Sequence, residues 1–211
     1  MTKRYKNPPK YGIISKRRDG ANMKNKLASS ITRRGLLGAF AATAVTASPT
    51  YSNAAGFLRG GGEIRRLKMY SGRTGESIDT IYWIEGDYIP QAMTEVDHFF
   101  RDWRSGQTHQ IDTRTIDIVA ATQNLLDTSQ PYTLVSGFRS RQTNAMLRSN
   151  SSGVARNSLH LQGKAADLRM QGRSVDQMAR AAASCSAGGV GSYTGSNFVH
   201  MDCGTVRSWG S

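Results

Sequence analysis

Positive charge is concentrated at the start of the chain, and this limits which part of the chain can form a folded domain. The 211-residue sequence carries a formal net charge of +13 at pH 7. Residues 1–55 contain 11 Lys or Arg and one Asp, which gives 11 − 1 = +10. The other 17 basic and 14 acidic residues give 17 − 14 = +3. The part after residue 55 is therefore nearly neutral, and its charge gives no argument for a nucleic-acid partner.

Residues 1–54 have the organisation of an export signal. A basic stretch ends in Arg33 and Arg34, an apolar run covers 35–47, and small residues surround Ala54. This is the order of n-region, h-region and cleavage region in a signal peptide. The run of 13 residues is shorter than the roughly 20 residues that span a bilayer as a helix.

The pattern Thr-Arg-Arg-x-Leu-Leu in this leader resembles a twin-arginine signal. An ordinary Sec signal and an uncleaved anchor are the alternatives. We expect the leader to engage the twin-arginine translocon and the rest of the chain to act in a bacterial periplasm, with no stable membrane span in the mature form. Cys185 and Cys203 lie in the exported part, where they could pair or stay as free buried thiols.

Residues 63–211 are long enough for one hydrophobic core, after a flexible junction at 55–62. Alternating apolar residues on both sides of a turn predict a β-hairpin over 64–84. Helical spacing predicts helices over 90–103 and 112–126. Shorter elements follow: a strand from 132, a helix at 141–149, a strand at 164–170, a helix at 174–184 and a final hairpin or edge strand at 188–204. This irregular order favours an α+β fold, an antiparallel sheet with helices packed on it.

Two short segments hold the candidate chemistry. "SLHLQGKAADLRM" contains His160 and Asp167, and "NFVHMDCG" contains His200 and Asp202. Side chains two apart on a strand point to the same face, so His200 and Asp202 project together. Two imidazoles and one carboxylate, with a fourth position for water, form the arrangement of catalytic zinc. On spacing alone, a surface His–Asp pair and a core histidine are the alternative.

The longer pattern Ser-x-His-x-x-Gly-x-Ala-x-Asp at 158–167 resembles the zinc D,D-peptidase superfamily of peptidoglycan enzymes. This superfamily shares its fold with the hedgehog signalling domain. The closest likeness is to exported bacterial murein endopeptidases of the penicillin-insensitive type, and it extends over 63–209. The resemblance implies one zinc ion held by His160, Asp167 and His200. It also implies hydrolysis of D,D- or L,D-peptide cross-links, with peptidoglycan peptide stems as the substrate.

The chain departs from this family at the general base. Many relatives have a glutamate three residues before the last zinc histidine, where this chain has Asn197, and no glutamate follows Glu95. We expect Asp202 to take the catalytic role because it shares a strand face with His200. The alternative is that Asp202 orients His200 or another ligand.

Arg139, in "SGFRS", is expected near the substrate carbonyl or a substrate carboxylate, because a guanidinium binds carboxylates and oxyanions. A surface salt bridge is its alternative role. Ser136, Gln142 and Asn144 are weaker candidates for substrate binding. Two other functions stay open: a D,D-carboxypeptidase, and a non-catalytic murein- or protein-binding module with a structural zinc site.

Overall fold

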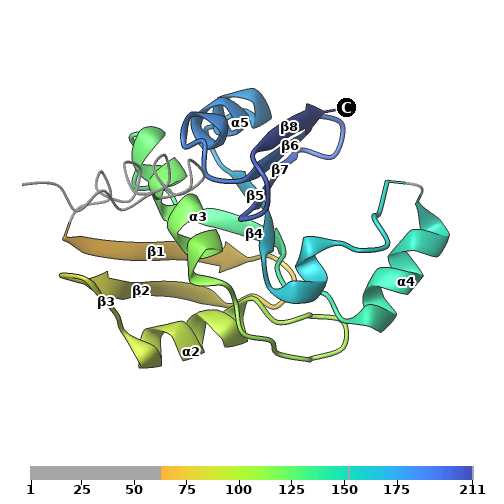
Figure 1. Ribbon diagram of the computed structural model, residues 1–211, viewed down its shortest axis with the longest axis horizontal. Coiled ribbons are helices and arrows are strands. Elements are labelled where there is room, and N and C mark those ends of the chain that lie inside the picture. Colours follow the sequence, from red (N-terminus) through yellow and green to blue (C-terminus); the bar gives the residue numbers. More distant parts are fainter. Residues whose placement is uncertain (1–62, 152, 211) are drawn as a thin grey trace, which may run out of the picture. The chain divides into compact units, whose positions relative to one another are not determined.

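The computed structural model describes residues 63–151 and 153–210, so the predicted leader and the predicted junction lie outside the described residues. One sheet runs through this part in the order β3-β2-β1-β4-β5-β7-β6-β8 (Figure 1). Its strands are β1 (Ile64–Ser71), β2 (Ser77–Ile84), β3 (Asp87–Tyr88), β4 (Tyr132–Ser136), β5 (Ala165–Met170), β6 (Gly189–Tyr193), β7 (Phe198–Asp202) and β8 (Arg207–Gly210). The helices are α2 (Pro90–Phe99), α3 (Thr113–Leu125), α4 (Arg141–Asn150), α5 (Val175–Ser184) and the short 3-10 helix η1 (Leu159–Gln162).

The predicted α+β class is confirmed, but the sheet is mixed and not antiparallel throughout. β4 pairs with β1 in parallel, and β8 pairs with β6 in parallel. A parallel pair needs a long crossover, and α2 and α3 provide it between β1 and β4. At the other end of the sheet, β7 lies between β5 and β6. The strand that follows β7 in the chain, β8, therefore pairs with the free side of β6.

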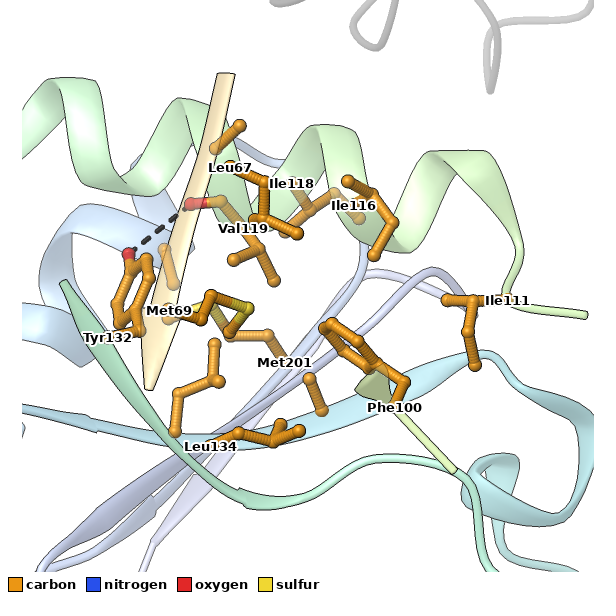
Figure 2. Close-up of a cluster of buried hydrophobic side chains, with 14 of the residues drawn as sticks. Leu67, Met69, Phe100, Ile111, Ile116, Ile118, Val119, Tyr132, Leu134 and Met201 are labelled. Atoms are coloured by element: carbon orange, nitrogen blue, oxygen red, sulfur yellow. Dashed lines mark hydrogen bonds between the residues drawn. The ribbon is translucent and has the colours of Figure 1, made fainter. Parts of the chain in front are cut away.

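The hydrophobic core lies between the helices and one face of the sheet. Figure 2 shows α3 placing its apolar side chains over strand residues such as Met69, Leu134 and Met201. The hydroxyl of Tyr132 donates a hydrogen bond of 3.3 Å to the carbonyl oxygen of Val119, which satisfies this polar group inside the core (Figure 2). Because side chains alternate along strands, the opposite face of β5 and β7 is left to polar residues.

The ends of the predicted helices follow local chemistry. α2 ends at Phe99, four residues before the predicted end, and buried Phe100 caps it with an N–H bond to the carbonyl of Val96. α3 begins after Asp112, whose side chain accepts from the N–H of Arg114. Ser174 and Gln177 form a capping box at the start of α5.

The two cysteines of the described part are both buried and unpaired. Of the two states left open by the sequence, the structure has the free thiols, and burial raises the pKa of each. Among the described helices, none combines the length and the apolar character that crossing a bilayer requires.

A buried carboxylate joins α3 to the first hairpin. Asp117 is 2% exposed and accepts hydrogen bonds from Arg65 Nη1 (2.8 Å), Tyr82 Oη (2.9 Å) and Tyr88 Oη (2.6 Å). Removing one partner of a buried ion pair is strongly destabilising, because the remaining groups were positioned around its charge. This network therefore fixes the hairpin against the helix.

Replacing Asp117 by Ala is expected to lower the free energy of unfolding by about 3–5 kcal/mol, the usual cost of breaking a buried pair. The matched control is Asp79→Ala, which removes the exposed partner of Arg66 (2.5 Å) and should cost less than about 1 kcal/mol. Urea denaturation followed by circular dichroism measures both. Equal losses in the two variants would contradict a structural role for the buried network.

Candidate metal centre

Three side chains from separate elements meet on the polar face of the sheet. His160 comes from η1, Asp167 from β5 and His200 from β7. His160 Nε2 lies 3.1 Å from Asp167 Oδ1, His200 Nδ1 lies 2.8 Å from the same oxygen, and the two nitrogens are 3.2 Å apart. The sequence predicted these three residues as ligands of one ion, and the structure brings them together.

Asp167 and His200 meet because of the register between β5 and β7. They are direct cross-strand partners in an antiparallel pair. Their neighbours Leu168 and Val199 point into the core, where both are fully buried. The apolar face thereby sets the register, and the polar face receives the two ligands opposite each other.

A backbone carbonyl holds the ring nitrogen of His160 that points away from the other two ligands. This nitrogen, Nδ1, lies 2.6 Å from the carbonyl oxygen of Gly137, which can only accept a hydrogen bond. Nδ1 therefore carries the hydrogen, and Nε2 presents its lone pair to Asp167 and His200. Gly137 is required at this point, since an added Cβ would lie 2.5 Å from the carbonyl oxygen of Phe100.

Burial and mutual charge set the protonation of the three groups. Burial lowers the pKa of His160, which favours the neutral imidazole. Although burial raises the pKa of Asp167, interactions with His160 and His200 bring it well below its usual value. Burial likewise lowers the pKa of His200, but hydrogen bonds to Asp167 and Asp202 raise it to about 9.

The donor set fits a divalent cation. A tetrahedral zinc site with bonds of roughly 2.0–2.1 Å has ligand atoms about 3.3 Å apart. The three separations here are 3.1, 2.8 and 3.2 Å, and all three ligand atoms lie within 4.8 Å of one another. Two imidazole nitrogens and one carboxylate oxygen are also ligands that zinc prefers.

Asp202 lies on the far side of the His200 ring. Its Oδ2 accepts from His200 Nε2 at 2.9 Å, while Nδ1 of the same ring faces Asp167. The carboxylate also accepts from the N–H groups of Gly189 (3.1 Å) and Gly204 (2.8 Å) and from both Nη atoms of Arg207. Burial raises the pKa of Asp202, but these hydrogen bonds lower it more. Of the two roles that the sequence left open, these contacts favour orientation of His200.

Arg139 contacts the centre directly. Its Nη2 donates to Asp167 Oδ2 and lies 3.1 Å from His160 Nε2, and its Nε donates to Ser136 Oγ at 2.8 Å. The side chain is 12% exposed. Ser136, predicted to bind substrate, thus holds Arg139 in place, and Arg139 forms an internal ion pair at the pocket and not a surface salt bridge.

The other two predicted substrate residues lie on α4, away from the ligands. Asn144 is buried, and its Nδ2 donates to the carbonyl oxygen of Ala155 at 3.2 Å. It therefore supports the loop at 153–158, part of which lines the pocket. Gln142 is exposed on the first turn of the helix and is not among the residues that line the pocket. Neither residue contacts the three ligands in the described part of the chain.

A pocket of about 350 Å³ opens over the three ligands. Aromatic residues form one side of it: Tyr193 stacks on Phe198 with centroids 4.6 Å apart, and Trp209 Nε1 donates to Tyr193 Oη at 2.9 Å. The acidic residues that line it are Asp167 and Asp202. Asn197, which stands at the family's glutamate position, is exposed in the turn before β7 with φ of 52°.

Several groups that shape the site were not predicted from the sequence. These are the carbonyl of Gly137, the side chain of Phe198 and the Arg207 guanidinium, which lies 4.7 Å from the Trp209 ring while bonding Asp202. Gly137, two residues before Arg139, was the one local signal, because a glycine allows another part of the backbone to come close. The others depend on strand pairing that the sequence does not specify.

Comparison with known proteins agrees with this geometry. Residues 59–209 match the family model described as "Peptidoglycan L,D-endopeptidase MepK". The protein of that name from Escherichia coli K12 is 41% identical over 145 residues, which is 69% of this chain and 80% of the relative. A probable peptidoglycan L,D-endopeptidase MepK from Haemophilus influenzae is 37% identical over 146 residues, 69% of this chain and 78% of the relative. The chain therefore belongs to the peptidoglycan L,D-endopeptidase MepK family, within the D-Ala-D-Ala peptidase superfamily of peptidoglycan metallopeptidases.

Proposed function

We propose that this protein is a metal-dependent peptidoglycan endopeptidase that hydrolyses L,D-peptide bonds in the stems and cross-links of murein. The observation that carries the proposal is the convergence of His160, Asp167 and His200 at one end of a pocket. Membership of the MepK family, whose curated relatives are named L,D-endopeptidases, favours the L,D bond over the D,D bond. One zinc ion is the proposed cofactor.

A divalent cation held by these three residues supplies a Lewis acid that polarises a carbonyl and activates water. The protein's own part is to hold the ligand atoms in a fixed arrangement, from which His200, with its pKa raised to about 9, would release the Nδ1 proton when a cation binds. Gly137 keeps the hydrogen of His160 on Nδ1, and Asp202 keeps that of His200 on Nε2. Both imidazoles therefore direct their remaining nitrogen toward Asp167.

Arg139 is proposed to bind the negative charge that develops on the scissile carbonyl oxygen, or a substrate carboxylate beside it. Ser136 and Asp167 hold the Nε and Nη2 atoms, and the side chain lines the pocket, where its remaining donors are proposed to meet the substrate. A donor fixed in advance is worth more to a transition state than a mobile one, because it needs no reorganisation during the reaction.

Asp202 is proposed to orient His200 and not to move the proton itself. A carboxylate that accepts five hydrogen bonds from His200, Gly189, Gly204 and Arg207 is a weak base, because each bond stabilises its charged form. The sequence prediction of a general base at this position stays untested by geometry alone, and the variants below separate the two roles.

We also propose that the protein works outside the cytoplasm, with peptide stems as its partner in the periplasm. The support is the basic and apolar pattern of residues 1–54, together with relatives named for peptidoglycan. The twin-arginine route is part of this proposal. Cell fractionation after replacing Arg33 and Arg34 by lysine tests it, since that change keeps the charge.

Purified protein loaded with zinc is expected to bind about one ion per chain and to convert cross-linked muropeptides to shorter products, because the ligand set fits a single four-coordinate ion. Mass spectrometry of the products and elemental analysis measure the two quantities. A chelator should abolish cleavage. Removal of only a terminal D-alanine would identify a D,D-carboxypeptidase instead.

The His160→Ala variant separates catalysis from a structural metal site. A catalytic site should lose cleavage by more than about 100-fold while the thermal unfolding midpoint of the metal-free protein changes little. A structural site should lose stability as well, since metal binding then contributes to folding. Loss of folding with no cleavage by the wild type would favour a non-catalytic binding module.

The Asp202→Asn variant is expected to bind metal about 10- to 100-fold more weakly, which is typical when a group that orients a ligand is changed. If Asp202 orients His200, activity should recover substantially at saturating zinc. If Asp202 is the general base, a loss of kcat of about 100-fold or more should persist at saturating zinc. Kinetics over a zinc titration distinguish these outcomes.

The Arg139→Lys variant is expected to lose about 100- to 1000-fold in kcat/KM, the usual effect of removing a positioned oxyanion donor. A lysine keeps the charge, but its three donors share one nitrogen and cannot take the separate positions that the rigid guanidinium fork offers to Ser136, Asp167 and the pocket. Steady-state kinetics on one muropeptide measure the loss. Activity within about threefold of the wild type would show that charge alone suffices.

A further inference from the structure

A group of basic and aromatic side chains outside the ligand set lies at a loop that is hydrogen-bonded to the segment carrying Arg139. It consists of Arg73, in the turn between β1 and β2, with Trp103 and Arg104, in the loop after α2, and is called the basic patch below. We propose that the basic patch is a second substrate subsite, which binds a free carboxylate of the peptide that occupies the pocket. This inference rests on the proposed function, because it names the part of the substrate that extends beyond the metal centre.

The two guanidinium groups of the basic patch lie against the same ring. Arg104 Cζ is 4.1 Å and Arg73 Cζ is 5.2 Å from the centroid of Trp103, whose side chain is 36% exposed. Within the described residues, neither guanidinium forms a hydrogen bond or an ion pair with an acidic side chain. Both groups are solvent-accessible, so their donors are available to an anion from solution.

The loop that holds the basic patch is fixed at both ends. Arg101 forms a two-pronged pair with Glu76, with bonds of 2.8 and 2.9 Å, which ties the loop to the start of β2. The N–H of Asp102 donates to the carbonyl of Gln107, and the N–H of Gly106 donates to the carbonyl of Asp102. Glu76 is thus engaged by Arg101, and within the described residues it forms no ion pair with Arg73 or Arg104.

One buried carboxylate connects the basic patch to the metal centre. Asp102 Oδ1 accepts from the N–H of Arg104 at 3.1 Å, and Oδ2 accepts from the N–H of Ser140 at 2.9 Å. Ser140 directly follows Arg139. The Asp102 carboxylate therefore bonds the backbone of Arg104 on one side and the backbone next to Arg139 on the other. Figure 1 shows the loop after α2 passing beside the segment that leads into α4.

The charges of Asp102, Arg104 and Arg139 are close enough to affect one another's pKa. Burial raises the pKa of Asp102, but hydrogen bonds from Thr143, Ser140 and Arg104 lower it to about 2, so it stays ionised as a fixed support. Burial lowers the pKa of Arg104, and although the negative charge of Asp102 raises it, the positive charges of Arg73 and Arg139 act in the lowering direction. An anion between these groups relieves that repulsion, in addition to gaining its own hydrogen bonds.

A carboxylate-bearing peptide fits this chemistry better than an uncharged sugar. Guanidinium forks match the planar geometry of a carboxylate, and peptide stems carry several such groups. The exposed face of Trp103 offers an apolar surface for the methylene groups next to the carboxylate. The substrate thus meets Arg139 at the scissile bond and the basic patch farther along.

The test compares two forms of one cross-linked muropeptide, one with free side-chain and stem carboxylates and one with these carboxylates amidated. For each protein the measured quantity is the ratio of kcat/KM for the free-acid form to kcat/KM for the amidated form. Replacing both Arg73 and Arg104 by Gln is expected to lower this ratio by about 3- to 10-fold, since exposed ion pairs contribute modestly. The effect should shrink at high salt, because solvent-exposed charges are screened.

The matched control is Arg180→Gln, which removes an exposed arginine of α5 and should leave the ratio unchanged. An unchanged ratio in the double variant, with a wild type that cleaves, would overturn the subsite and leave the proposed function standing. An equal loss on both substrates would also overturn it, because the patch would then recognise an uncharged part of murein.

If the wild type with bound zinc cleaves neither substrate, the proposed function fails, and a binding measurement still decides on the subsite. Calorimetric titration of each muropeptide into wild-type and double-variant protein measures the dissociation constants. Their ratio between the amidated and the free-acid form then takes the place of the ratio of kcat/KM. A lower preference for the free-acid form in the double variant supports the subsite. Equal preference in both proteins overturns it.

Discussion

The cross-strand pair of Asp167 and His200 is the interaction on which the centre depends. A carboxylate that is 4% exposed is costly to bury unless cations or donors surround it, and here His160, His200 and Arg139 all contact it. The pair exists because β5 and β7 run antiparallel in one register. A shift by one residue would send Asp167 into the core and bring Leu168 to the pocket. Apolar packing on one face of the sheet thereby determines the metal chemistry of the other.

The sequence predicted the strands and helices whose patterns are local and missed those that depend on distant partners. Alternation in β1 and β2 was sufficient, since the core lies on one side of each strand. β3 and β8 were missed because they are short edge strands defined by their pairing. The parallel pairing of β4 with β1 was missed for the same reason, since a crossover is a property of the whole chain.

The site divides in the same way. His160, Asp167 and His200 were predictable because a spacing motif contains the first two, strand alternation draws attention to His200, and the family resemblance joins all three. Their supports were not: the carbonyl of Gly137 reaches His160 across 23 positions, and Ser136 reaches Arg139 around a turn. Asp202 illustrates the limit well. Alternation placed it correctly beside His200. No sequence pattern tells which nitrogen of the His200 ring it contacts. That contact distinguishes a carboxylate that carries a proton from one that orients the ring.

The local backbone at Asn197 fits the absence of a glutamate at the position where the family resemblance places one. The residue lies in the turn between β6 and β7 with a positive φ of 52°, a conformation that asparagine adopts far more readily than glutamate. The tight turn and the missing glutamate therefore have one local cause. The acids left at the pocket, Asp167 and Asp202, are both engaged by several donors and have lowered pKa values. These two observations favour the proposal that fixed positive charge from Arg139 contributes more to the reaction than a strong carboxylate base.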